Sequence, residues 1–359
     1  MSQRKRIGIL TSGGDCAGLN SVIRAVVCHA VGNYGWEVLG ICEATHGLMN
    51  RPPKVMRFDP DSVERLLTMG GTVLGTTNKG DPFAFPMPDG SLRDRSQEII
   101  DGYHSLRLDA LIAIGGDGSL AILRKLALQG NIALIGIPKT IDNDVGATEI
   151  SIGFDTATTI ATEALDRLHF TAASHSRVMV LEVMGRDAGH IALSAGIAGG
   201  ANIILIPEIP YQIENVCRLI RQRQAMGKPF CLVVVSEAVC TESGEKITQI
   251  DQGQHRLGGI GQYIAEQIAQ HTGAETRVTV LGHVQRGGIP SSLDRLLGSA
   301  FGVAAVDLIA NGESDRMVAW KNPDVISVPI AEAIQTYRAV DPEGTLVKTA
   351  RGLGICLGD

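Results

Sequence analysis

The chain has few aromatic residues, no excess of positive charge and no long apolar run, and each deficit narrows its class. Only 4% of its 359 residues are aromatic, and the formal net charge is −6. A negative balance gives no general attraction to nucleic acid or to an anionic membrane. The apolar run Ile7–Leu10 is too short for a signal peptide or a membrane span. We therefore expect a cytoplasmic protein without a nucleic-acid or membrane partner.

Paired cysteines and several familiar catalytic motifs are also missing. The seven cysteines are an odd number and include no Cys-x-x-Cys pair, which favours buried, reduced thiols over disulfides or a zinc site. Gly-x-Ser-x-Gly and His-Glu-x-x-His do not occur, so a hydrolase or a zinc enzyme has no motif to support it. There is no repeat of 20–50 residues and no Gly-X-Y period, which excludes a collagen.

Glycine, by contrast, is abundant. There are 43 glycines, where an average chain of this length would have about 25. A hydrophobic share of 44% with 19% charged residues excludes a disordered chain. The glycines therefore indicate either flexible segments or many places where the backbone approaches a ligand closely.

Short apolar runs alternate with segments of helical pattern. The runs predict strands at Ile7–Leu10, Glu37–Cys42, Ala110–Ile114, Ala133–Ile137, Val178–Val183, Ile203–Ile206, Cys231–Val235 and Val278–Leu281. The helical pattern predicts helices at Leu19–Val31, Asp155–Phe170, His190–Ala198, Gln212–Met226 and Ser291–Ile309. Continuous apolar strands between helices are typical of a doubly wound α/β fold with largely parallel sheets, where ligands bind beyond the carboxyl ends of the strands. The proline-rich segment 79–90 is expected to be a surface loop.

Two glycine-rich motifs each follow a strand and open a helix. The first, Thr11–Asn20, reads TSGGDCAGLN, and the second, Ile114–Leu120, reads IGGDGSL. Backbone N–H groups at such a turn suit phosphate oxygens, and the carboxylate of Asp117 suits Mg²⁺ on a polyphosphate. Each motif could instead be a tight turn that binds nothing, with Asp117 as a helix N-cap.

A third motif, Pro138–Asp144, reads PKTIDND and follows another strand. In an extended loop Thr140, Asp142 and Asp144 share a face, because residues two apart point the same way. Such a pair of carboxylates could provide a general base and a group near a metal ion. The alternative is a cluster of Asx-turns.

Three further motifs in the second half of the chain carry cations and a carboxylate. They are Val183–His190 (VMGRDAGH), Ser236–Glu237 and Leu281–Gly288 (LGHVQRGG). Cationic groups at or near predicted strand ends could clamp a phosphate monoester, and they are Arg177, Arg186, Arg277, His283 and Arg286. Any one of them alone would most simply be a solvated surface group, or a core residue whose hydrogen bonds are satisfied. Together the six motifs contain the components of phosphoryl transfer to a phosphorylated acceptor.

In this order, TSGGD, GGDGS, TIDND, VMGR and LGHVQRGG resemble the phosphofructokinase A family from about Ile7 to about Leu308. The resemblance implies two similar doubly wound domains with the active site in the cleft between them. A nucleotide-binding domain would comprise residues 1–153 plus about 285–335. A sugar-phosphate-binding domain would comprise 154–284 plus about 336–359. It also implies a homo-oligomer, usually a tetramer.

The activity implied by the resemblance is phosphorylation of fructose 6-phosphate at its 1-hydroxyl by Mg-ATP. Asp142 would be the base, Thr140 and Arg186 would stabilise the phosphoryl group, and Asp117 would hold Mg²⁺ with Asp144 beside it. Nucleotide contacts would come from Gly13, Gly116, Asp117, Gly118, Ser119 and Lys79. Contacts to the sugar phosphate would come from Thr140, Asp142, Asp144, Arg177, Met184, Gly185, Arg186, Glu237, Arg277, His283 and Arg286. Of these, Arg177 and Arg277 would reach across a subunit interface.

Two positions bear on the phosphoryl donor. Lys139 resembles the pyrophosphate-using branch of the family, whereas Gly118 leaves room for the α-phosphate of ATP. We weigh Gly118 more heavily, because it determines whether the adenylate fits, and we keep a pyrophosphate-dependent enzyme as the alternative. More remote alternatives are a non-catalytic sugar-phosphate sensor and a dehydrogenase, although the latter lacks Gly-x-Gly-x-x-Gly.

The resemblance also predicts altered regulation. In bacterial relatives a basic cluster between subunits binds ADP or phosphoenolpyruvate. Charge is kept at Arg24, Lys54 and Lys228, but Cys28, His169 and Met226 replace basic residues. We therefore expect weaker binding of these two effectors, or none.

Overall fold

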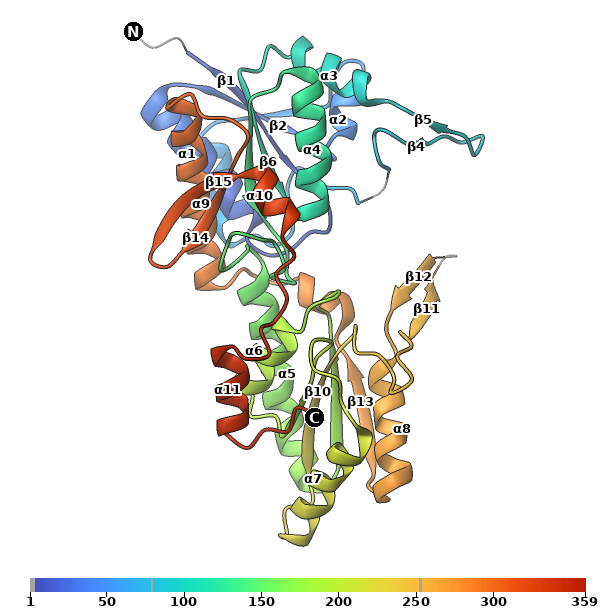
Figure 1. Cartoon of the computed structure of the whole chain (residues 1–359). Coiled ribbons are helices and arrows are strands. Elements are labelled where there is room, and N and C mark those ends of the chain that lie inside the picture. Colours follow the sequence, from blue (N-terminus) through green and yellow to red (C-terminus); the bar gives the residue numbers. More distant parts are fainter. Residues whose placement is uncertain (1–3, 79, 252–253) are drawn as a thin grey trace. The chain divides into compact units, whose positions relative to one another are not determined.

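The computed structural model describes residues 4–78, 80–251 and 254–359, which fold into two compact units (Figure 1). Unit 1 comprises Met1–Asp155 and Arg286–Tyr337, and unit 2 comprises Thr156–Gln285 and Arg338–Asp359. Each unit is therefore built from two separate stretches of the chain.

Within the described residues, unit 1 contains a seven-stranded sheet in the order β15-β14-β7-β6-β1-β2-β3. Its strands are β1 (Arg6–Thr11), β2 (Glu37–Ile41), β3 (Val55–Phe58), β6 (Ala110–Gly115), β7 (Leu134–Pro138), β14 (Arg316–Lys321) and β15 (Asp324–Pro329). Neighbouring strands from β14 to β2 pair in parallel, and the two edge strands β3 and β15 are antiparallel to their neighbours. The carboxyl ends of the central strands therefore meet at one edge of the sheet.

Unit 1 also contains the helices α1 (Leu19–Tyr34), α2 (His46–Met49), α3 (Ser96–Ser105), α4 (Asp117–Gly130), α9 (Ser292–Ala310) and α10 (Ile330–Gln335), and the 3₁₀ helix η1 (Asp61–Thr68). A short hairpin is formed by β4 (Phe85–Pro86) and β5 (Leu92–Arg93). Close packing of α9 on α1 requires small residues, because a Cβ at Gly302 would lie 2.7 Å from the Cβ of Ala25. Apolar side chains of β6, β7 and α4, such as Leu111, Leu134 and Leu123, form the adjoining core.

Unit 2 has a four-stranded parallel sheet in the order β13-β8-β10-β9. Its strands are β8 (Val178–Val183), β9 (Ile203–Leu205), β10 (Cys231–Ser236) and β13 (Thr276–Val280), with a separate hairpin of β11 (Thr248–Asp251) and β12 (Gln254–Leu257). Its helices are α5 (Phe154–His175), α6 (His190–Ala198), α7 (Ile213–Ala225), α8 (Ile260–Thr272), α11 (Thr345–Gly352) and the 3₁₀ helix η2 (Gly282–Arg286). The first two residues of α5 belong to the first stretch of unit 1, and the rest of the helix belongs to unit 2. Because β8 and β10 are buried along their whole length, their sequences are almost continuously apolar.

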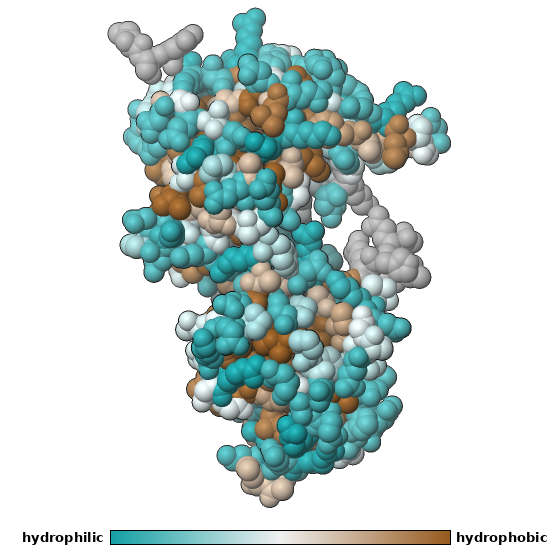
Figure 2. All heavy atoms as spheres, viewed as in Figure 1, coloured by the Kyte–Doolittle hydropathy of each residue, from teal (hydrophilic) through white to brown (hydrophobic). Residues whose placement is uncertain are grey.

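The expected α/β fold with mostly parallel sheets is confirmed, and each predicted strand and helix coincides with an observed element. β13 begins two residues earlier than predicted. The segment 79–90, expected to be a loop, contains β4, and residue 79 lies outside the described residues. Hydrophilic residues dominate the face shown in Figure 2. None of the helices in the described part of the chain has the length and apolar character needed to cross a membrane.

Candidate active site

The three motifs of unit 1 follow β1, β6 and β7, which are neighbours in the sheet. The register pairs Thr11 with Ile114 and Gly115 with Pro138, so these strands end at nearly the same level. The turns after them consequently share one edge, as the parallel arrangement requires.

At this edge the first turn touches the other two. A Cβ at Gly13 would lie 3.0 Å from Ser119 Oγ and 3.2 Å from Lys139 Nζ, and its φ of +85° lies in the region that favours glycine. The Gly13 N–H donates to the Thr77 carbonyl at 3.0 Å, and Thr76 Oγ1 donates to the Gly13 carbonyl at 2.7 Å. Gly13 therefore contributes space rather than a backbone donor.

Lys139 is a buried cation at the centre of this group. Its side chain donates to the Gly14 carbonyl at 2.7 Å, and the residue is 4% exposed. Burial lowers the pKa of the Lys139 ammonium, while the neighbouring Cys16 and Asp142 act in the opposite direction. Arg286 also lies here, with Nη1 donating to the Asp15 carbonyl at 3.2 Å.

The neighbouring thiol of Cys16 is fully buried, and burial raises its pKa to about 12. It donates to the Ile152 carbonyl at 3.4 Å. All seven cysteines are free, as expected, but only Cys16, Cys217 and Cys231 are buried and the other four are half-buried.

The loop after β7 holds two buried carboxylates. Asp142 is 5% exposed and Asp144 is 2% exposed. Thr140 Oγ1 donates to Asp142 Oδ2 at 3.2 Å and accepts from the Asp142 N–H at 3.1 Å. Asn143 between them adopts φ +56° and accepts from the Ser151 N–H at 3.0 Å, which fixes the loop. The turn here is formed by the Thr140 hydroxyl rather than by the Asx side chains of the anticipated alternative, and it orients the Asp142 carboxylate.

The GGDGS motif forms the start of α4. Asp117 is its first residue, and no side chain in the described structure caps this helix end, which leaves first-turn N–H groups for an anion. A Cβ built on Gly118 meets no atom within 4 Å. The backbone here therefore faces open space.

In unit 2 the loop after β8 is held by side chains from its neighbours. Glu237, after β10, accepts with Oε1 from the N–H groups of Gly185 at 3.2 Å and Arg186 at 3.0 Å. Gln285, in the loop after β13, accepts from the Met184 N–H at 2.7 Å. Met184, Gly185, Arg186 and Glu237 are therefore brought together as the motifs predict. His283 is exposed on η2 at the same end of the sheet.

The five predicted cations do not form one cluster within unit 2. Arg177 and Arg277 lie at the amino ends of β8 and β13, opposite the edge that carries Arg186 and His283. Both pair with Glu275, Arg177 at 2.9 Å and Arg277 at 2.5 Å. The hydrogen bond from Arg177 lowers the pKa of the Glu275 carboxyl. Arg286 belongs to unit 1.

Three side chains that organise these loops were given no role from sequence. Gln285 is one, although it lies within the LGHVQRGG motif. Glu182, buried in β8, accepts from the N–H groups of Gly259 and Gly261 at the start of α8. Glu208 accepts from the Gly189 N–H at 3.0 Å and from the Val340 N–H at 2.9 Å. For Glu182 the sequence does contain a signal, because a carboxylate within an otherwise apolar strand must find a partner when it is buried.

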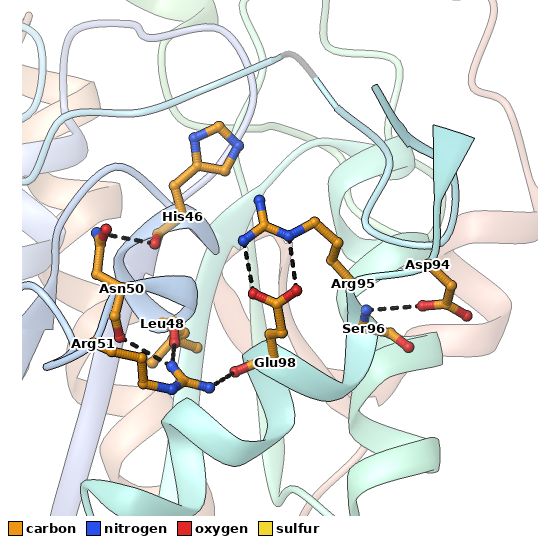
Figure 3. Close-up of polar contacts among 8 residues, drawn as sticks. All are labelled: His46, Leu48, Asn50, Arg51, Asp94, Arg95, Ser96 and Glu98. Atoms are coloured by element: carbon orange, nitrogen blue, oxygen red, sulfur yellow. Dashed lines mark hydrogen bonds and ion pairs between the residues drawn. The ribbon is translucent and has the colours of Figure 1, made fainter. Parts of the chain in front are cut away.

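The residues expected in an effector pocket include Lys54, beside a cavity of about 550 Å³. Lys54 pairs with Glu43. The adjacent Arg51 donates to the carbonyls of Leu48, Asn50 and Glu98, and Arg95 forms a two-bond pair with the Glu98 carboxylate (Figure 3).

Glycine-rich turns, a buried lysine and buried carboxylates at the carboxyl ends of parallel strands define a doubly wound α/β protein of the kind that binds phosphorylated ligands. The family model described as phosphofructokinase matches residues 6–309. The chain belongs to the phosphofructokinase family.

Curated relatives match over the whole chain. It is 75% identical to ATP-dependent 6-phosphofructokinase 1 of Synechocystis sp., with 100% of both chains covered. It is 53% identical to ATP-dependent 6-phosphofructokinase of Thermosynechococcus vestitus, with 100% of this chain and 94% of that protein covered.

Solved structures share the fold. Phosphofructokinase from Pichia pastoris matches with a TM-score of 0.81 and 28% identity over 99% of this chain, which spans 37% of the Pichia chain. The pyrophosphate-dependent enzyme from Marinobacter aquaeolei matches with a TM-score of 0.80 and 20% identity, over 99% of this chain and 92% of that one. At that identity the likeness concerns the fold alone.

Proposed function

We infer that this chain is an ATP-dependent 6-phosphofructokinase. It transfers the γ-phosphoryl group of ATP to the 1-hydroxyl of fructose 6-phosphate, giving fructose 1,6-bisphosphate and ADP, a step of glycolysis in the cytoplasm. The observation that carries ATP as donor is the open space at Gly118, at the uncapped start of α4. The 75% identity to an ATP-dependent relative supports the same donor.

The nucleotide lies against the turns of unit 1. Gly13, Gly116, Gly118 and Ser119 line its phosphates, which accept from first-turn N–H groups of α4, and of the three glycines Gly118 has open space around it. Lys79, the other expected nucleotide contact, lies outside the described residues.

Asp117 fits a magnesium ion bound together with the phosphates. Mg²⁺ is usually held by one or two carboxylates plus phosphate oxygens, and the described residues contain no cluster of three potential ligands. Asp117 would hold the ion, with Asp144 in the neighbouring loop. When bound, the ion would offset the negative charge of the phosphate oxygens.

Asp142 is the general base. Its carboxylate accepts the proton of the 1-hydroxyl as that oxygen bonds to the γ-phosphorus, and the bond from phosphorus to the β–γ bridging oxygen of ADP breaks. Thr140 holds the carboxylate through its hydrogen bond of 3.2 Å. Arg186 donates to the transferring phosphoryl oxygens, and Thr140 stabilises the same group when its single hydroxyl proton turns from Asp142 to a phosphoryl oxygen.

The sugar phosphate binds the loops of unit 2 through Met184, Gly185, Arg186, Glu237 and His283, with Arg286 as a further cation. Arg177 and Arg277 serve the site of a neighbouring subunit in a homotetramer. Their position at the opposite edge of the sheet supports this role, because they cannot join Arg186 in the same chain's loop cluster.

Replacing Asp142 by Asn tests the base. The amide keeps the shape of the carboxylate but cannot take the proton, so we expect turnover to fall by roughly a thousandfold while fructose 6-phosphate still binds, measured by calorimetry. Turnover within tenfold of the unmodified enzyme would refute the assignment.

A pyrophosphate-dependent reaction is the second candidate, favoured by Lys139. Its ammonium lies next to the Gly13 turn and could face a compact polyphosphate. The same lysine is compatible with the β- and γ-phosphates of ATP, so it does not outweigh Gly118.

A further inference from the structure

The loop after β8 has three successive backbone N–H groups that are bound by side chains from two other loops. The Met184 N–H donates to Gln285 Oε1 at 2.7 Å. The next two, of Gly185 and Arg186, donate to Glu237 Oε1. The path of the loop is therefore held by its neighbours as well as by its own turn, in which the Ala188 N–H donates to the Gly185 carbonyl at 2.9 Å.

The backbone at Arg186 needs such support. Its φ is +53°, a conformation that is unfavourable for a residue with a Cβ. Strained residues persist where the surrounding structure over-determines them, and they are common at functional sites. The strain lies at the residue to which we assign contact with the phosphoryl group.

Gln285 is placed to provide part of this support. It is 1% exposed and lies on η2 between His283 and Arg286. Its amide nitrogen donates to the Ala157 carbonyl at 3.5 Å while its oxygen accepts from Met184. One buried side chain thus joins α5, η2 and the Met184–Arg186 loop.

We propose that Gln285 is a positioning residue for the sugar phosphate, which sets the Met184–Arg186 loop relative to His283 without touching the ligand. This rests on the proposed function, because it concerns the affinity of the same site for fructose 6-phosphate. It predicts an effect on that substrate and none on the nucleotide.

Gln285→Met provides the main test. Methionine has a similar length but cannot accept the Met184 N–H, and an unsatisfied buried donor costs enough to weaken binding roughly tenfold or more. We expect KM for fructose 6-phosphate to rise by that factor and kcat to fall with it, because Arg186 in the same loop contacts the transferring phosphoryl group, while KM for ATP stays within about twofold. Gln285→Glu keeps an acceptor oxygen for Met184 but loses the donor to the Ala157 carbonyl, so it should keep the slow exchange of the Met184 amide and recover the affinity only in part.

Asn202→Leu is the matched control. Asn202 Oδ1 accepts from the Leu232 N–H at 3.0 Å at the amino ends of β9 and β10, in the same unit but at the other edge of the sheet. We expect a comparable drop in melting temperature and no change in KM. If KM for fructose 6-phosphate rose as much in this variant as in Gln285→Met, the effect of Gln285 would be explained by overall stability and the proposal would be wrong.

Hydrogen exchange of the Met184 amide gives a readout that does not require turnover. Gln285→Met should speed this exchange at least tenfold, and Asn202→Leu should not. Faster exchange with an unchanged KM would overturn the functional part of the proposal, and unchanged exchange would overturn the positioning itself. If the unmodified protein does not phosphorylate fructose 6-phosphate, the proposed function is wrong and the KM prediction is wrong with it. The exchange measurement would still test whether Gln285 positions the Met184–Arg186 loop.

Discussion

At the scale of single residues, Gly118 has the clearest chemical consequence. We predict that Gly118→Asp lowers kcat/KM for ATP by roughly a hundredfold, because the new carboxylate would repel the α-phosphate at a cost of several kcal/mol. The fold should tolerate the change, since a Cβ here meets no atom within 4 Å and an acidic residue suits a helix N-terminus. Steady-state kinetics and thermal melting measure the two effects.

Gly118→Ala is the control for this substitution, because it adds the Cβ without the charge. It should keep kcat/KM for ATP within about fivefold. An equal loss in both variants would mean that bulk, and not charge, excludes the nucleotide. Full ATP activity in Gly118→Asp would contradict the assignment of this position to the α-phosphate.

Lys139 predicts a pH dependence of stability. Burial lowers the pKa of Lys139 in the folded protein, so between that value and about 10.5 the unfolded chain binds more protons. The destabilising effect of the buried charge is therefore largest at low pH and disappears as pH rises through this window. We expect the Lys139 contribution to the free energy of unfolding to increase with pH there, whereas buried thiols such as Cys16, whose pKa is raised, contribute in the opposite direction.

Lys139→Met should remove this increase. Urea unfolding between pH 7.5 and pH 10 would show a flatter dependence for the variant than for the unmodified protein. Parallel pH profiles for the two proteins would show that Lys139 titrates normally in the folded state.

At the scale of elements, the strands that could be predicted from sequence are the short apolar runs, wherever they lie in a sheet. They include both edge strands of the smaller sheet, β9 and β13, whereas β3, β14 and β15 of the larger sheet were not predicted. Buried parallel strands such as β8 are apolar throughout and are recognisable as single runs. The edge strand β15 alternates between exposed and partly buried residues, and the short helix α11 has only a few buried positions, so neither gives a strong signal. Side-chain partners from distant loops, such as Gln285 with Met184, depend on tertiary contacts that no local pattern encodes.

The junction between β8 and α8 supports a prediction at this scale. Glu182→Leu leaves the N–H groups of Gly259 and Gly261 without their acceptor, and we expect it to lower the free energy of unfolding by roughly 2–3 kcal/mol. Glu182→Gln keeps one acceptor oxygen and should cost less. Denaturant unfolding of both variants checks the order, and a leucine variant as stable as the unmodified protein would contradict the capping role.

At the scale of the whole molecule, the candidate residues were predictable by type but their grouping was not. The motifs identified both glycine-rich turns and the carboxylate loop. The residues alone suggest one clamp of five cations, although Arg177 and Arg277 stand at the start of their strands and Arg186 follows its strand, which in a parallel sheet places them at opposite edges. The family resemblance assigns Arg177 and Arg277 to a neighbouring subunit.

This separation predicts that the active form is an oligomer. Arg177 and Arg277 are held by the partly exposed Glu275, an ion pair weak enough in water to be exchanged for a phosphate of a neighbouring subunit. On dilution, KM for fructose 6-phosphate should rise at the protein concentration where sedimentation detects dissociation, with KM for ATP unchanged. A monomer with full affinity would contradict the shared site.

The choice of phosphoryl donor is tested most directly by assaying the purified protein with fructose 6-phosphate and Mg²⁺, supplying either ATP or pyrophosphate at equal concentration. From the open backbone at Gly118 we predict rapid formation of fructose 1,6-bisphosphate with ATP and at least a hundredfold less with pyrophosphate. Turnover with pyrophosphate alone would contradict the assignment and would make Lys139, rather than Gly118, the residue that indicates the donor.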